Sequence, residues 1–171
     1  MTDHTPNSLR AVITSLREIV GPSVDPADPL AQQQLTLSLA YLEFLGSRLA
    51  YLPARDRFEL EHHLGLAAGV VDALGDGETA WAAELCAAMS EGQRILGTAG
   101  TAGSAVRNAT AVIAAHISQI VESDLTEGVR KKLEVAIVQG SARRIEFDRA
   151  WYAPMGFDPN PTPDLQEFLA S

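Results

Sequence analysis

The stretch Gly97–Val121, GTAGTAGSAVRNATAVIAAHISQIV, decides the fold class of this chain. After Val106, apolar side chains recur at steps of three and four at Ile113, Ile117 and Ile120, which is typical of one face of an α-helix. The glycine-spaced run Gly97–Ser104 precedes this helix and follows another helical segment. Such a run either joins two helices or opens a helix whose free N–H groups hold an anion.

The glycine run does not match the known phosphate loops. A P-loop requires a lysine, which is absent beside Gly103 and Ser104. A Rossmann loop requires a preceding strand, whereas residues 93–96 complete a helix. Two interpretations stay open: a helix linker, or an anion site formed by Gly103, Ser104 and Arg107.

Helical periodicity continues on both sides of this stretch, and no segment alternates with period two. Asp28 before Pro29 is a typical N-cap, and Ser8 has the same role at the first helix. Because the connections are short, neighbouring helices must run antiparallel. Besides residues 104–121, the predicted helices cover residues 8–20, 29–52, 53–74, 78–96 and 124–152.

The predicted fold is therefore an all-α antiparallel bundle of about six helices over residues 1–152. The glycine run would divide it into sub-bundles 8–96 and 104–152. A Pro-rich tail follows over residues 153–171, in which Leu165, Phe168 and Leu169 would seek a groove on the bundle or on a partner.

Composition and charge exclude several classes of protein. The chain has 171 residues, of which 46% are hydrophobic, and a net charge of −9, which opposes general nucleic-acid binding. Residues 129–149 are locally basic. This stretch is interpreted either as a solvated helix face or as a docking patch for an acidic partner or a nucleotide. The longest apolar stretch, residues 35–52, is interrupted by Glu43 and Arg48, and the first residues lack a signal-peptide pattern. We therefore expect a cytoplasmic protein without a membrane span.

Five glycines lie inside predicted helices, where each costs roughly 1 kcal/mol relative to alanine. We expect close helix approach to compensate, either within the chain or against a second subunit. These glycines are Gly46, Gly65, Gly69, Gly92 and Gly140.

The densest group of candidate metal ligands is residues 59–63, where Glu59 and His62 form an E-x-x-H pair. Di-iron bundles need this pair twice, but the residue three positions before His116 is Ile113. We expect no metal site and no cofactor, with Glu59 and His62 as weak candidates only.

No catalytic constellation emerges. Cys86 lies in an apolar helix, and no serine-hydrolase elbow is present. An alternative is an internal cavity between helices that binds a small molecule, such as a nucleotide or an acyl-CoA. Its candidate lining residues are His62, His63, His116, Tyr41 and Trp81.

The first quarter of the chain carries a recognisable helix punctuation. It comprises Leu9-Arg10, Arg17-Glu18-Ile19-Val20, Asp28-Pro29-Leu30-Ala31 and Gly46-Ser47-Arg48-Leu49. This pattern resembles small all-helical bacterial proteins of unknown function associated with aminoglycoside-phosphotransferase-like kinases or acyl-CoA dehydrogenases. The resemblance carries no catalytic residue, and it implies an accessory role beside an enzyme.

Together these observations predict a helical accessory or interaction module, and they favour a non-catalytic role over an enzymatic one. We expect it to form a homo-oligomer, namely a dimer. We also expect it to bind a protein partner in a bacterial cytoplasmic system. The alternative is a helical bundle that binds a small molecule or a metal.

Overall fold

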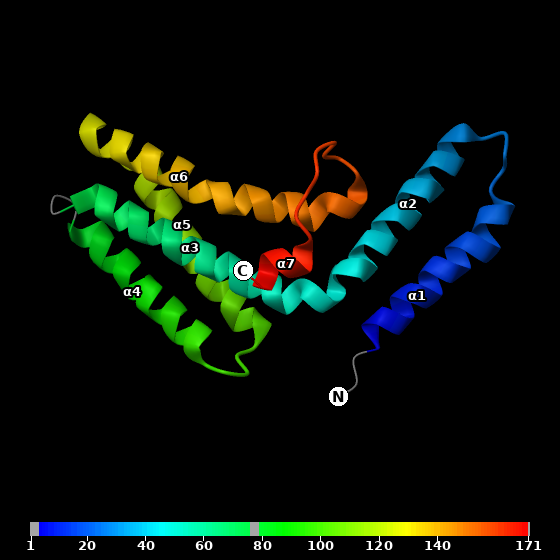
Figure 1. Cartoon of the computed structure of the whole chain (residues 1–171), viewed down its shortest axis with the longest axis horizontal. Coiled ribbons are helices and arrows are strands. Elements are labelled where there is room, and N and C mark those ends of the chain that lie inside the picture. Colours follow the sequence, from blue (N-terminus) through cyan, green and yellow to red (C-terminus); the bar gives the residue numbers. More distant parts are fainter. Residues whose placement is uncertain (1–3, 76–78, 171) are drawn as a thin grey trace. The chain divides into compact units, whose positions relative to one another are not determined.

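The computed structural model describes residues 4–75 and 79–170, and within them the chain is all-α with no strand. The helices are connected by short segments, and Figure 1 follows them along the chain. They are α1 (Thr5–Ser15), α2 (Pro29–Arg48), α3 (Leu52–Leu74), α4 (Thr79–Gly97), α5 (Gly103–Glu122), α6 (Glu127–Tyr152) and the short α7 (Leu165–Ala170). The predicted all-α bundle with a Pro-rich tail is thereby confirmed.

The chain folds into two compact units. Unit 1 is Met1–Leu52 with Trp151–Asn160, and unit 2 is Pro53–Ala150 with Pro161–Ser171. The glycine run at 97–104 lies inside unit 2, where it joins α4 to α5, so the division between the units falls elsewhere than at the expected sub-bundles. The tail is likewise shared, with its first part in unit 1 and α7 in unit 2.

Unit 1 is built on the α1–α2 hairpin (Figure 1). Asp28 caps α2 as predicted, since its carboxylate accepts the N–H groups of Leu30 and Ala31. The prediction for Ser8 is wrong: α1 starts at Thr5 with His4 as N-cap, because Pro6 suits the first helical turn. A π-helical segment, Leu16–Val20, continues α1 toward the turn.

A small aromatic group holds the end of α6 within unit 1. Arg48 is buried, donates from Nε to the carbonyl oxygen of Trp151 at 2.8 Å, and lies over the rings of Phe44 and Trp151. Tyr152 stacks on Phe44 at 5.5 Å between ring centroids. The contacts with two aromatic faces and a carbonyl oxygen compensate for the cost of burying this charged guanidinium.

Unit 2 contains the continuous hydrophobic core, formed by α3, α4, α5 and α6. The buried residues follow the three-and-four spacing predicted for these helices, so each helix turns one apolar stripe inward. They are Leu60, Leu64, Ala67, Val70, Ala73, Leu74, Leu85, Ile95, Val106, Ala109, Ile113, Ile117, Ile120, Leu125 and Leu133.

The interior glycines of unit 2 differ in what surrounds them. A Cβ added to Gly92 would lie 3.1 Å from Ile113 and 3.2 Å from Leu64, and one added to Gly140 would lie 3.0 Å from Leu66. Gly65 meets no atom within 4 Å. Close approach within the chain therefore accounts for Gly92 and Gly140, but not for Gly65.

The helix α7 packs within its own chain, through contacts inside unit 2. Leu165 is buried, and the ring of Phe168 lies 5.6 Å from Phe58 and 5.9 Å from Phe147. Asp164 caps the helix by accepting the N–H of Gln166 at 2.7 Å.

Of the helices in the described ranges, none combines the length and the apolarity needed to cross a bilayer.

Candidate interaction surface

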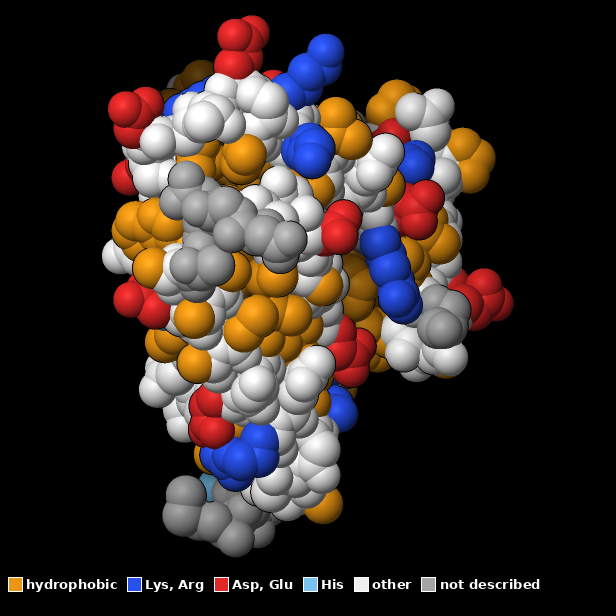
Figure 2. All heavy atoms as spheres, turned by 90° about the vertical axis from the view of Figure 1, so that its left-hand side faces the viewer, with side chains coloured by type: hydrophobic (Ala, Val, Ile, Leu, Met, Phe, Trp, Pro, Cys, Tyr) orange, Lys and Arg blue, Asp and Glu red, His pale blue; other side chains and the backbone are white. Residues whose placement is uncertain are grey.

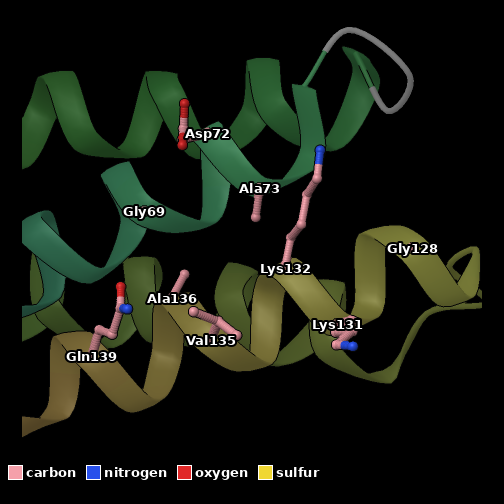
Figure 3. Close-up of a pocket in the computed structure, with 9 residues that line it drawn as sticks. All are labelled: Gly69, Asp72, Ala73, Gly128, Lys131, Lys132, Val135, Ala136 and Gln139. Atoms are coloured by element: carbon pink, nitrogen blue, oxygen red, sulfur yellow. The ribbon is translucent and has the colours of Figure 1, made fainter.

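A groove of about 620 Å³ opens between α3 and α6 in unit 2 (Figure 3). Its floor is made of small residues, and a Cβ on Gly69 would lie 3.5 Å from that of Ala136. Small side chains on both helices leave the space that larger ones would fill. The lining residues are Gly69, Asp72, Ala73, Gly128, Lys131, Lys132, Val135, Ala136 and Gln139.

Two exposed lysines supply the positive charge of the groove. Neither Lys131 nor Lys132 forms an ion pair with a described residue. Figure 3 shows Lys132 extending from α6 toward α3, where Asp72 is the acidic residue of the lining. An ammonium group that is not paired with any described side chain is available to a ligand anion or to the carboxylates of a partner.

The arginines of the basic stretch 129–149 are already used in contacts within unit 2. Arg144 pairs with Glu59 and Asp148, and Arg143 lies over the rings of Phe58 and Phe168. Arg130 donates to the carbonyl oxygen of Ser123, and Arg149 to that of Pro161. The predicted basic patch therefore reduces to the two lysines. On the face drawn in Figure 2, acidic and basic side chains are interspersed.

An exposed aliphatic strip on α6 adjoins the groove. It consists of Val135, Val138, Ala142 and Ile145, of which Val138 is 73% exposed. The spacing of three, four and three residues places these side chains on one line of the helix, as in a helix–helix seam. Exposed aliphatic residues in a row mark a surface suited to a partner.

The two adjacent histidines lie on α3 in different surroundings. His62 stacks on Phe58 with 6.4 Å between ring centroids, and Nδ1 of His63 lies 2.7 Å from the carbonyl oxygen of Glu59. Burial lowers the pKa of His62 from its ordinary value; His63 and Arg144 lower this pKa further, and Asp148 opposes them. His62 is thus favoured as the neutral imidazole.

Of the weak metal candidates Glu59 and His62, the first already forms ion pairs with arginine. Both carboxylate oxygens of Glu59 form ion pairs, one with Arg144 and the other with Arg55 at 3.7 Å. Among the residues that the structure describes, no group of three or more His, Cys, Asp or Glu side chains is arranged to hold a metal ion. A carboxylate paired with two guanidiniums is a poor ligand, because binding a cation would require breaking both pairs.

The other predicted cavity residues lie on separate elements. In α5, Nδ1 of His116 lies 3.9 Å from Glu84 and makes no hydrogen bond to the described part of the chain. Trp81 of α4 packs, half-buried, against the core, and Tyr41 of α2 is exposed in unit 1. The described contacts join His62 to His63, with 5.3 Å between ring centroids, and bring neither of them to His116 or Trp81.

The predicted anion site at the start of α5 has an acidic neighbour from its own chain. Arg107 pairs with Asp56 of α3 at 2.5 Å. The same Asp56 oxygen lies 3.1 Å from a Cβ added to Gly103, and Ser104 is exposed. The carboxylate of Asp56 therefore neutralises Arg107 and lies beside the helix N-terminus, where it would repel a second anion.

Comparison of the chain with protein-family models, curated proteins and solved structures found no match. The resemblance of the first quarter to helical bacterial proteins stays a prediction.

The sequence pattern alone does not predict the groove or the α6 strip. The helical period over residues 124–152 predicts an inner seam, but it does not say whether aliphatic residues outside that seam are covered. Val135, Val138 and Ile145 were the available signal, because a solvent-facing stripe is normally polar.

Proposed function

We propose that this chain is a non-catalytic helical interaction module that self-associates and acts as an accessory partner of another protein in a bacterial cytoplasmic system. The observation that carries the proposal is the α6 strip beside Lys131 and Lys132, an aliphatic line next to two lysines that form no ion pair with the residues the structure describes. Such a surface suits an amphipathic helix that carries acidic residues next to an apolar stripe.

The chemistry of the remaining polar side chains supports a non-catalytic role. General acid–base catalysis needs a nucleophile, a base and an orienting group within hydrogen-bond reach. Glu59 and Arg107 are occupied by ion pairs, and Nδ1 of His63 contacts a main-chain carbonyl. These contacts stabilise the bundle rather than prepare a reaction.

The partner proposal is tested by affinity capture of the tagged chain in its own cells. Val138→Glu places a carboxylate in the α6 strip and should remove the captured partner, whereas Val12→Glu, on the exposed side of α1, should retain it. Capture that is equal for both variants would contradict the α6 strip as the docking surface. Sedimentation equilibrium of the wild-type chain tests self-association, and a monomer at all concentrations would contradict that part.

The groove favours a second candidate function, binding of a nucleotide or an acyl-CoA-like molecule. Its two lysines would contact phosphate groups, and its small-residue floor would admit an apolar part. Thermal denaturation with ATP and with an acyl-CoA tests this function, since a ligand at a hundred times its Kd adds about 2.7 kcal/mol to the free energy of unfolding. The shift should vanish in Lys131→Gln/Lys132→Gln, and a chain unaffected by either ligand would contradict this candidate.

A further inference from the structure

The helix α2 in unit 1 is apolar on two sides. One side packs on α1, where a Cβ added to Gly46 would lie 3.4 Å from Leu9. The other side carries Leu30, Leu37, Tyr41 and Leu45, whose exposed fractions are 64%, 43%, 51% and 51%. A helix that is apolar all round is normally covered on both faces, so the second side needs a partner.

The exposed side of α2 forms one continuous strip. With about 100° of rotation per residue, its members fall within about 80° of the helix circumference. We define the α2 strip as Leu30, Gln34, Leu37, Tyr41 and Leu45. Each of these residues is exposed, so the strip extends along most of α2.

The charge of the strip distinguishes between occupants. Residues 29–42 contain no charged side chain, and the next carboxylate, Glu43, pairs with Arg17. A charged partner would find no opposite charge on the strip. A membrane surface is also disfavoured, because interfacial helices carry Lys and Arg on the polar face, and Arg48, the single cationic residue of α2, is buried.

A second copy of this chain fits these properties. Each copy has a net charge of −9, so two copies repel at long range, and a contact through an uncharged surface adds no further repulsion between facing carboxylates. A two-fold contact places the same patch against itself, which a neutral strip tolerates and a charged one does not. Gln34 and Tyr41 suit such a contact, because an amide and a phenol each donate and accept hydrogen bonds.

We infer that two copies of this chain associate through the α2 strip, with α2 antiparallel to α2 about a two-fold axis near Leu37. An axis between residues 37 and 38 places Leu30 against Leu45 of the second copy and Gln34 against its Tyr41. The inference rests on the self-association in the proposed function and assigns its surface.

Sedimentation equilibrium of the full chain and of two matched glutamate variants tests this interface. Leu37→Glu should weaken dimerisation by about 100-fold, because two carboxylates would face each other across the axis. Val112→Glu, at a similarly exposed position of α5 that lies outside both strips, should change it by about twofold at most. Circular dichroism of both variants checks that the helices are intact.

Disulfide trapping provides a test that does not depend on a destabilising charge. In a Cys86→Ser background, Leu37→Cys should oxidise to a covalent dimer, and Val138→Cys should stay monomeric under the same conditions. A wild-type chain that remains monomeric overturns self-association and this inference together. A wild-type dimer that resists Leu37→Glu and is cross-linked only through Val138→Cys overturns the α2 interface alone, and self-association stands.

Discussion

Units 1 and 2 use helices of similar length in different ways. In unit 2 the apolar stripes of α3 to α6 meet in a continuous core, while in unit 1 full burial is confined to Phe44, Arg48 and Trp151 of the described residues. Because stability comes mainly from burial of apolar area, unit 2 holds most of what stabilises the chain. Unit 1 leaves more of its large apolar side chains exposed than unit 2 does, which suits association.

The largest expected effect compares two aromatic residues on α6, one in each unit. Phe147 in unit 2 is fully buried and stacks on Phe58 at 4.2 Å, whereas Tyr152 in unit 1 is 43% exposed. Phe147→Ala should reduce the free energy of unfolding by about 3–5 kcal/mol. Tyr152→Ala should cost only about 1 kcal/mol, from the loss of its stacking on Phe44. Chemical denaturation measures both, and equal losses would break the contrast between the units.

A second comparison is made within unit 1 and concerns its buried cation. Arg48→Leu removes the hydrogen bond to the Trp151 carbonyl and both ring contacts, so it should cost about 1–3 kcal/mol. Arg17→Gln, which breaks the exposed pair with Glu43, should cost no more than about 1 kcal/mol. Thermal unfolding measures both, and an Arg48→Leu variant as stable as wild type would mean that unit 1 does not depend on this contact.

Two glycines of unit 2 should respond to alanine with opposite signs. Gly65→Ala adds a methyl group in open space and should raise the free energy of unfolding by up to about 1 kcal/mol, through helix propensity. Gly92→Ala inserts a methyl group against Ile113, Leu64 and Leu60, and should lower it by about 1–2 kcal/mol. Urea denaturation midpoints give both signs. If both substitutions were stabilising, the side chains around Gly92 must rearrange to accommodate the added methyl group.

The smallest effect is the pH dependence that His62 gives to unit 2. Its pKa is lowered in the folded chain by burial, His63 and Arg144, so the unfolded chain binds the proton more tightly. Above the pKa of about 6.5 that His62 has in the unfolded chain, its contribution to the free energy of unfolding is fully present. This contribution is lost as the pH falls from that value through the lower pKa of His62 in the folded chain. The melting temperature should therefore drop on acidification, and His62→Gln should reduce this drop. His4→Gln, at an exposed position, should leave it unchanged; equal curves for the two variants would exclude His62 as the cause.

Much of the fold could be predicted because its signals are local. The helix over residues 104–121, the cap at Asp28 and the inward positions of Ile113 and Ile117 follow from spacing within a few turns. The candidate surface could be predicted less well from the sequence, because residues far apart in the sequence decide whether each lysine or arginine forms an ion pair. Arg144 and its partner Glu59 are separated by 85 positions in the sequence, and no local pattern distinguishes Arg144 from Lys132.

The sequence by itself therefore determined an all-α chain with mostly short connections, since backbone propensity, capping and amphipathic period act over a few residues. Only the tertiary structure decided that the glycine run lies within unit 2, that Asp56 neutralises Arg107, and that α7 packs on its own chain. It also decided which apolar strips, on α2 and α6, stay uncovered. Burial depends on contacts between residues far apart in the sequence, and those contacts exist only after the helices have packed.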